Sequence, residues 1–321
     1  MIYAQINSSK KTSYLQESLA DTRARHMGSL FLDDADPHLQ PAFSAASNQV
    51  PPVILSLPHG GRYFPRSAEP FLCDLAESQT LEDTGTFEIC QHLGPAHQLL
   101  IQPVSRAIVD VNRPEDTLDP MITGAHRTGR KDYWQRFIDA GYGVVPRLSA
   151  SRKQLFNTTL PPALIESWLS SFHASFHQIL TTKLLEAASH HSRVLLLDIH
   201  SMPDDNTARQ LPDIVFGNMH QASCRSDITL RLNKMAEEVG LSYDWNRPYA
   251  GGYITRHYAR LPIENDRPPI AAAQIEVVQI EFNRRLYQTR AGKSEVLDSA
   301  ALMRLGQWLD RTATHLNSYL G

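Results

Sequence analysis

Cysteine is scarce in this chain, which has three in 321 residues: Cys73, Cys90 and Cys224. Because no two of them are closely spaced, we expect neither a disulfide framework nor a thiolate zinc site. Long apolar runs are also missing, since no stretch approaches the roughly 18 apolar residues that a membrane span needs. Residues 1–25 lack the apolar run of a secretory signal. We therefore expect a soluble, cytoplasmic protein.

An excess of charge of one sign is absent as well. The chain has 31 Lys and Arg against 34 Asp and Glu, and a formal net charge of −3. This balance gives no reason to expect a nucleic acid or an anionic membrane as partner. The Gly-x-Ser-x-Gly, His-Glu-x-x-His and Gly-rich phosphate-binding motifs are missing too. Histidine, by contrast, is plentiful with 14 residues, and imidazole is both a metal ligand and a base near neutral pH.

The chain has two regions of different pattern. Residues 1–48 are polar and weakly periodic, and we expect an N-terminal extension outside the core, followed by one domain over residues 49–321. Five apolar runs in that domain have the length of buried strands: 53–57, 107–111, 194–199, 213–216 and 277–282. Apolar residues at helical spacing occupy 161–188, 225–239 and 297–318. This alternation predicts an α/β fold with a largely parallel sheet.

Two histidines stand where predicted strands end, the edge at which such sheets bind ligands. His59 lies in the turn Pro58-His59-Gly60-Gly61, either as a metal ligand or as a turn residue that caps backbone groups. Asp198 and His200 are two residues apart in a strand and therefore share a face. The carboxylate would fix the tautomer that metal binding needs. The alternative is a buried pair without function, which we disfavour because burying charge is costly.

A third metal ligand would have to be a carboxylate, because a catalytic zinc usually has three protein ligands and one open position. Glu82 and Asp83, which precede a probable helix, are the candidates. Asp83 also suits the N-cap of that helix, and its spacing alone favours the cap.

Glu281 lies in a strand made otherwise of apolar residues. A carboxylate there is costly unless it is paired or catalytic. It is therefore either a general base that activates water or the partner of Arg106, Arg113 or Arg284. Arg106 and Arg113 themselves indicate an acidic substrate, because guanidinium groups bind carboxylates in a bidentate way, unless Asp110 holds them.

Two further features are less specific. Residues 246–258 form a stretch rich in glycine and aromatic residues, which we interpret as a loop that closes over a ligand. His173 and His177 share one face of a predicted helix. We interpret them, like His190 and His191, as packing or surface residues.

Several of these segments together resemble the N-formylglutamate amidohydrolase (deformylase) family over about residues 50–290. They are Pro58-His59-Gly60-Gly61, Ser105-Arg106 through Asn112-Arg113, Asp198-Ile199-His200-Ser201, Gly251 to Tyr258 and Gln279-Ile280-Glu281-Phe282-Asn283. The resemblance implies a phosphorylase/hydrolase-like α/β domain related to the zinc carboxypeptidases, with a mixed, mostly parallel central sheet flanked by helices.

The resemblance also implies roles for individual residues. The metal, zinc or another divalent ion, would be held by His59, Asp83 and His200, with Glu82 open as the alternative carboxylate. Glu281 would activate water. The substrate would be bound by seven residues: Arg106, Asn112, Arg113, Tyr249, Gly252, Arg256 and His257.

The implied reaction is hydrolysis of N-formyl-L-glutamate to formate and L-glutamate, the last step of one bacterial route of histidine degradation. Two alternatives stay open. One is a related zinc amidohydrolase that acts on another N-acyl amino acid or small amide. The other is a metal-free binding protein on the same fold. The sequence makes no prediction of the oligomeric state.

Overall fold

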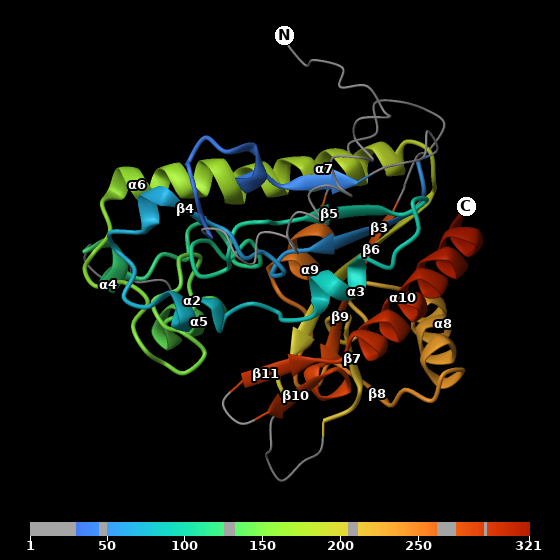
Figure 1. Ribbon diagram of the computed structural model, residues 1–321. Helices are drawn as coiled ribbons and strands as arrows, with labels where there is room; N and C mark the ends of the chain where they lie inside the picture. Colours follow the sequence, from blue (N-terminus) through green and yellow to red (C-terminus); the bar gives the residue numbers. More distant parts are fainter. Residues whose placement is uncertain (1–29, 45–49, 125–131, 205–210, 262–273, 292–293) are drawn as a thin grey trace.

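A seven-stranded sheet forms the centre of the protein in a computed structural model that describes residues 30–44, 50–124, 132–204, 211–261, 274–291 and 294–321 (Figure 1). Its order is β2 (Ala42–Ser44), β5 (Gln98–Ile101), β3 (Val53–Leu57), β6 (Arg193–Met202), β9 (Gln274–Asn283), β7 (Ile214–Gly217) and β8 (Tyr243–Trp245). The four strands β5, β3, β6 and β9 are parallel, whereas β2 and β7 run antiparallel to their neighbours β5 and β9. The predicted mixed, mostly parallel sheet is confirmed.

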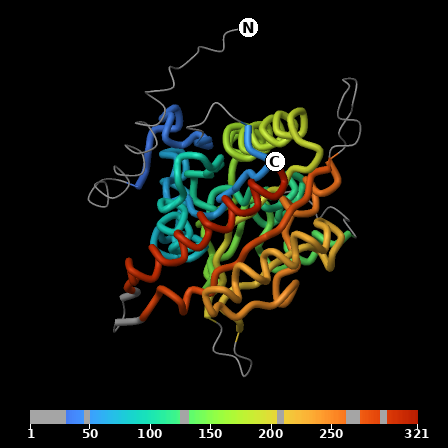
Figure 2. Tube along the Cα trace, turned by 90° about the vertical axis from the view of Figure 1, so that its right-hand side faces the viewer, coloured from blue at the N-terminus to red at the C-terminus, as the bar shows by residue number. Residues whose placement is uncertain are grey.

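Helices cover both faces of this sheet. One layer consists of α6 (Pro162–Trp168), a π-helical segment (Leu169–Ala174) and α7 (Ser175–Ala188), and the other of α3 (Thr86–Cys90), α8 (Ser226–Glu237) and α10 (Ser299–Leu320). Figure 1 shows α6 and α7 above the sheet, and in Figure 2 the red α10 crosses the side that faces the viewer. Successive residues of β6 face opposite layers, with Leu196 in the core under α7 and Leu197 in the core under α8 and α10.

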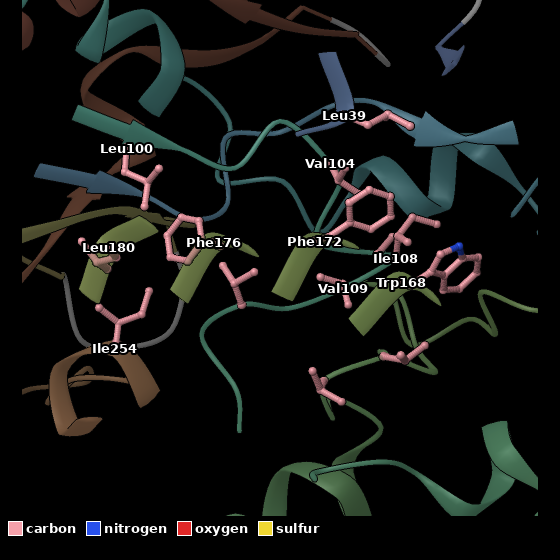
Figure 3. Close-up of a cluster of buried hydrophobic side chains, with 14 of the residues drawn as sticks. Leu39, Leu100, Val104, Ile108, Val109, Trp168, Phe172, Phe176, Leu180 and Ile254 are labelled. Atoms are coloured by element: carbon pink, nitrogen blue, oxygen red, sulfur yellow. The ribbon is translucent and has the colours of Figure 1, made fainter. Parts of the chain in front are cut away.

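The helical layer over 162–188 packs on the sheet through residues spaced by four. Trp168, Phe172, Phe176 and Leu180 are buried. Figure 3 shows Phe176 near Leu100 of the sheet, and Phe172 and Trp168 near Ile108. The predicted helix at 161–188 is therefore confirmed, and so are those near 225–239 and 297–318. The π-helical segment was not predicted.

Short elements connect these layers, and none is longer than six residues. They are β1 (Phe31–Leu32), η2 (Pro37–Leu39), β4 (Phe64–Pro65), η3 (Arg66–Ala68), α2 (Leu75–Gln79), α4 (Pro120–Thr123), α5 (Gln135–Ala140), α9 (Tyr253–Tyr258), η5 (Arg284–Leu286), β10 (Gln288–Ala291) and β11 (Ser294–Leu297). Several of them lie beyond the carboxyl ends of the central strands and carry side chains of the site.

The strand predicted at 107–111 is wrong, although its apolar side chains are buried in the core. The backbone turns here instead, because the carbonyl of Ser105 accepts hydrogen bonds from the amides of Ile108 and Val109. The Ser105 hydroxyl also accepts one from the amide of Ala107 at 3.3 Å, a local bond that competes with strand pairing. The neighbouring strand in the sheet is β5 at Gln98–Ile101, which the sequence analysis missed.

Part of the predicted N-terminal extension belongs to the fold. Leu39 is fully buried in the core, and β2 pairs with β5 at the edge of the sheet. The expectation that residues 1–48 lie outside the core is therefore corrected for 30–44, while 1–29 and 45–48 lie outside the described residues. The division into an extension and a domain over 49–321 stays a prediction.

The cysteines and the helices bear on the remaining expectations. Cys73 is exposed, Cys90 and Cys224 are buried, and all three are free thiols. Within the described ranges, no helix combines the length and apolar character that crossing a membrane demands.

Candidate active site

The carboxyl ends of β6 and β9 bring polar side chains to one face of the sheet. On the face of β6 that α7 covers, Asp198 and His200 follow the core residue Leu196. On the same face of β9, Gln279 and Glu281 follow the core residue Val277. His200 and Glu281 are direct neighbours in the register of the two strands. Side chains alternate between the two faces of each strand. The face that carries apolar core residues at the start of β6 and β9 therefore carries these four polar groups at the carboxyl ends of the two strands.

Three of the predicted ligands meet at this edge. The nitrogen and oxygen atoms of His59, Asp83 and His200 that could hold a metal ion lie within 4.8 Å of one another, and all three residues are buried. Asp83 Oδ2 is 2.8 Å from His200 Nδ1 and 3.4 Å from His59 Nδ1. Ligand atoms of a tetrahedral zinc ion lie about 3.4 Å apart at ordinary bond lengths. The spacing of these donors therefore suits a small divalent cation.

The other ring nitrogen of each histidine is held by a carboxylate. His59 Nε2 is 2.8 Å from Asp110, and His200 Nε2 is 3.0 Å from Asp198, which also accepts a hydrogen bond from Ser56. Metal-binding histidines typically donate this second N–H to a carboxylate. His59 Nδ1 is buried and has no hydrogen-bond partner. An unpartnered buried nitrogen that faces another histidine and an aspartate fits a metal ligand.

Carboxylates dominate the electrostatics of this group. Burial favours neutral His200, but the negative charge of Asp198 and the hydrogen bonds to Asp198 and Asp83 raise its pKa well above the ordinary value. Burial also opposes ionisation of Asp83, yet the hydrogen bond from His200 and the nearness of the His59 ring hold its pKa far below the usual range. The group therefore stabilises added positive charge, whether a proton or a metal ion supplies it.

Asp83, rather than Glu82, points into this group. The carboxylate of Glu82 accepts a hydrogen bond from Arg62 Nε at 2.7 Å, and Arg62 also binds Glu88. The N-cap alternative for Asp83 is excluded, because α3 begins after Gly85 and has no side-chain cap. Asp83 contacts Thr86 through its backbone carbonyl, which accepts hydrogen bonds from the amide and the hydroxyl of Thr86.

Glu281 lies beside the His–Asp–His group and is almost fully buried. Burial raises the pKa of its carboxyl to about 7, helped by the negative charge of Asp83 and opposed by His200, Arg106 and Arg284. Its Oε1 accepts a hydrogen bond from Gln279 at 2.7 Å. Within the described part of the chain it forms no ion pair, so the alternative of a buried ion pair with an arginine finds no support.

A pocket of about 550 Å³ opens onto these residues. Its wall includes six of the predicted residues beyond the histidines and Asp83: Arg106, Asn112, Arg113, Tyr249, Gly252 and Glu281. Arg106 Nε donates to Asp110 at 2.9 Å, and Arg113 lies 3.9 Å from the same carboxylate. Asp110 thus binds Arg106, in agreement with the alternative that this carboxylate pairs with the arginines. It also binds His59, which was not predicted from the sequence.

The predicted loop at 246–258 is a loop only in its first half, because residues 253–258 form α9. Asn112 Oδ1 accepts a hydrogen bond from the amide of Ile254 at 2.8 Å, near the start of this helix. A Cβ atom at Gly252 would lie within 2.6 Å of the Asn112 side chain, so only glycine permits this approach. Arg256 and His257 face Tyr133 and Tyr253 respectively, and neither lines the pocket.

His173 and His177 are more than packing residues. His173 Nε2 donates to the carbonyl of Arg113 at 2.8 Å, and His177 Nε2 to that of Val111 at 2.9 Å. Both histidines therefore hold the backbone on which Asn112 and Arg113 stand. Their four-residue spacing was visible in the sequence. Their partners were not, because Val111 belongs to a turn that was predicted as a strand, and Arg113 follows that turn.

An α/β domain with a buried glutamate beside a buried His–Asp–His group that could hold a metal ion has the arrangement of a hydrolase active site. The family model of N-formylglutamate amidohydrolase matches residues 51–288. This chain therefore belongs to the N-formylglutamate amidohydrolase family, a family of hydrolases of linear amide bonds, and the family assignment from its motifs is confirmed.

Curated relatives are named N-formylglutamate deformylase. The one from Pseudomonas putida is 27% identical over 242 residues, which cover 72% of this chain and 81% of the relative. The one from Pseudomonas aeruginosa is 26% identical over 243 residues, with 72% and 82% covered. Similarity to both therefore extends over most of the domain.

Two solved structures share the fold. An N-formylglutamate amidohydrolase from Ralstonia eutropha superimposes with a TM-score of 0.72 at 19% identity, covering 88% of this chain and 98% of that one. The gene product Atu2144 from Agrobacterium tumefaciens has a TM-score of 0.62 at 18% identity, covering 87% and 95%. At these identities the likeness establishes the fold and nothing further.

Proposed function

We propose that this protein hydrolyses the formamide bond of N-formyl-L-glutamate to formate and L-glutamate. The observation that carries the proposal is the buried group of His59, Asp83 and His200 with Glu281 beside it, in one pocket that arginines also line. The names of the family and of its curated relatives support the choice of substrate. A place at the end of histidine degradation would follow from that reaction.

We assign the metal to His59 Nδ1, His200 Nδ1 and Asp83, and zinc is the ion we expect. Asp110 and Asp198 hold the Nε2 atoms of the two histidines, so their Nδ1 atoms are the ones left to bind a cation. When bound, a divalent metal lowers the pKa of a water molecule and polarises a carbonyl oxygen.

Glu281 is the general base in this proposal. A carboxyl whose pKa is about 7 can accept a proton and return it near neutral pH. It removes a proton from the attacking water and delivers it to the amide nitrogen as the carbon–nitrogen bond breaks. The hydrogen bond from Gln279 orients the carboxylate for both steps.

The wall formed by Arg106, Asn112 and Arg113 binds the α-carboxylate of the substrate in this proposal. Guanidinium and amide N–H groups suit a carboxylate, and partial burial strengthens these charged hydrogen bonds. Tyr249 and Gly252 complete the wall from the segment before α9. Burial raises the pKa of Tyr249 to about 12, so its hydroxyl stays protonated and can donate a hydrogen bond.

The test combines metal analysis with an assay of formate release from N-formyl-L-glutamate, with and without a chelator. We expect one zinc per chain and activity that the chelator abolishes. The variant Glu281→Gln keeps the size of the side chain but removes the base. It should retain the metal and lose turnover by several powers of ten, and an active variant would exclude Glu281 as the base.

Other outcomes identify the alternatives. Stoichiometric metal without formate release would move the activity to another N-acyl amino acid or small amide. Neither metal nor turnover would favour a binding protein on this fold.

A further inference from the structure

Arg136 in the wall of the pocket differs from the other arginines there in its neighbours. Four arginines line the pocket: Arg106, Arg113, Arg136 and Arg284. Three of them lie within 4 Å of a carboxylate. Arg106 is 2.9 Å and Arg113 is 3.9 Å from Asp110, and Arg284 is 3.5 Å from Asp83. Among the residues that the structure describes, no carboxylate lies within 4 Å of Arg136.

Aromatic rings, not carboxylates, surround Arg136. Its guanidinium carbon lies 3.9 Å from the ring centre of Tyr133 and 4.7 Å from that of Phe137, and it also bonds to the Tyr133 hydroxyl. Arg256 lies 4.1 Å from the same Tyr133 ring, and its buried Nε has no hydrogen-bond partner. Stacking on a ring positions a guanidinium but leaves its charge in place. Two positive charges therefore meet at Tyr133.

A third cation adds to this charge. The guanidinium carbon of Arg113 lies 4.1 Å from the ring centre of Phe137, which Arg136 also contacts. Burial lowers the pKa of Arg113 to about 10, and the positive charges of Arg106 and Arg136 add to that effect against the attraction of Asp110. Within the described segments, neither Arg136 nor Arg256 has a carboxylate within 4 Å, so a ligand can supply the anion that completes this group.

The order of residues along the wall indicates which anion that is. Asn112 Nδ2 lies 3.4 Å from His200 in the His–Asp–His group, and the buried Arg113 follows Asn112. The exposed Arg136 contacts the same Phe137 ring as Arg113 and so continues this wall toward the surface. A substrate with its amide at the histidines and its α-carboxylate at Arg113 would direct its side chain toward Arg136. In glutamate, three carbon atoms separate the two carboxylate carbons, so the second carboxylate reaches outward along this wall.

We propose that Arg136, assisted by the positive charge of Arg256, binds the side-chain carboxylate of the substrate and selects dicarboxylic N-formyl amino acids. This assignment rests on the proposed deformylase function and makes Arg136 a residue that determines specificity. A bound anionic side chain would reduce the repulsion between Arg136, Arg256 and Arg113, of which only Arg113 is near a described carboxylate.

The test compares N-formyl-L-glutamate with N-formyl-L-glutamine, which has nearly the same shape but lacks the second charge. The wild-type enzyme should prefer the glutamate substrate. In Arg136→Gln the ratio of kcat/KM for the two substrates should fall by about 10- to 100-fold, the range of a charge-assisted hydrogen bond. Arg136→Lys, which keeps the charge but not the planar fork, should recover part of the ratio.

Arg231→Gln is the matched control. Arg231 also stacks on a tyrosine, at 3.3 Å from the ring centre of Tyr319, and contacts His315, but it lies on α8 and does not line the pocket. This variant should keep the wild-type ratio. A wild-type enzyme without preference for glutamate, or an Arg136→Gln variant that keeps the preference, would overturn the assignment.

A binding measurement separates this inference from the proposed function. Calorimetry with the product L-glutamate and with L-glutamine needs no turnover. If neither formyl substrate releases formate, the proposed function fails. The assignment of Arg136 then stands only if the wild-type protein binds L-glutamate more tightly than L-glutamine and the Arg136→Gln variant shows no such preference. Equal binding of the two amino acids by the wild-type protein would overturn the assignment.

Discussion

This protein contains two pairs of neighbouring histidines, His59 with His200 and His173 with His177, and the two pairs differ in the groups that surround them. The rings of His59 and His200 have centres 4.8 Å apart, and those of His173 and His177 4.5 Å apart. In the first pair each Nε2 faces a carboxylate, and in the second each Nε2 donates to a backbone carbonyl. The hydrogen bonds are of similar length, so the difference lies in the charge of the acceptor.

The charge of the acceptor decides what each pair can do. Carboxylates raise the pKa of His200 well above its ordinary value, whereas burial lowers the pKa of both His173 and His177. The first pair therefore attracts a cation, and the second stays neutral and holds the backbone of Val111 and Arg113. We call them the ligand pair and the backbone pair.

Removing a member of the ligand pair should have the largest effect. His200→Gln deletes one proposed ligand, so we expect loss of stoichiometric metal together with a fall in formate release by several powers of ten. Metal analysis and the formate assay on the same preparation measure both quantities. A variant with full metal content would show that His200 does not hold the ion, and would remove the distinction between the two pairs.

Removing a member of the backbone pair should leave the metal in place. His177→Asn leaves the carbonyl of Val111 without its donor, which costs about 1–3 kcal/mol of stability. Displacement of Asn112 and Arg113 should then raise KM for N-formyl-L-glutamate more than it lowers kcat. Steady-state kinetics and metal analysis measure these effects.

His191→Asn is the control for this variant. His191 Nε2 also bonds to a backbone carbonyl, that of Val50 at 2.7 Å, but far from the pocket. It should lose stability without a change in KM. Equal changes of KM in both variants would show that the backbone pair has only a structural role.

The smallest effect concerns pH. The pKa of His177 is lower in the folded protein than the ordinary value of 6.5, so below that pH the unfolded chain binds more protons than the folded one. The stability that neutral His177 contributes is thus fully present above its unfolded pKa and is lost as the pH falls toward its folded pKa. His177→Asn should therefore lose less unfolding free energy on acidification than the wild-type protein, by at most about 1.4 kcal/mol per pH unit.

Urea unfolding of the metal-free proteins at several pH values between about 7 and 5 measures this difference. His200 acts in the opposite direction in both proteins, because its raised pKa contributes stability at low pH that is lost at high pH. Its effect cancels when the variant is compared with the wild-type protein. Parallel curves would contradict the lowered pKa of His177.

Strands with strict apolar runs were predictable from the sequence. β3, β6, β7 and β9 coincide with predicted runs, because a strand buried on both faces needs apolar side chains throughout. Residues 107–111 were wrongly predicted as a strand for the same reason, because the buried turn at this position is also rich in valine and isoleucine. β5 was missed because its apolar run is only three residues long, Leu99 to Ile101, with Gln98 before it and Gln102 after it.

The site was predictable where strand geometry determines it. Asp198 and His200 share a face because side chains alternate along a strand, and the structure shows them in contact at 3.0 Å. The choice between Asp83 and Glu82, which are adjacent, could not be made from the sequence. It depends on Arg62, which binds Glu82 from 20 positions away.

By itself, the sequence determined the family and the class of fold, and it supplied the candidate side chains of the site, because apolar periodicity and short motifs are local properties of the chain. Only the tertiary structure decided which carboxylate joins the histidines, which group holds each imidazole, and which arginine of the pocket has no described carboxylate within 4 Å. Those outcomes depend on contacts such as that of His173 with Arg113, 60 positions apart. Burial and pairing change the charge state of a group, and both arise only when distant segments pack together.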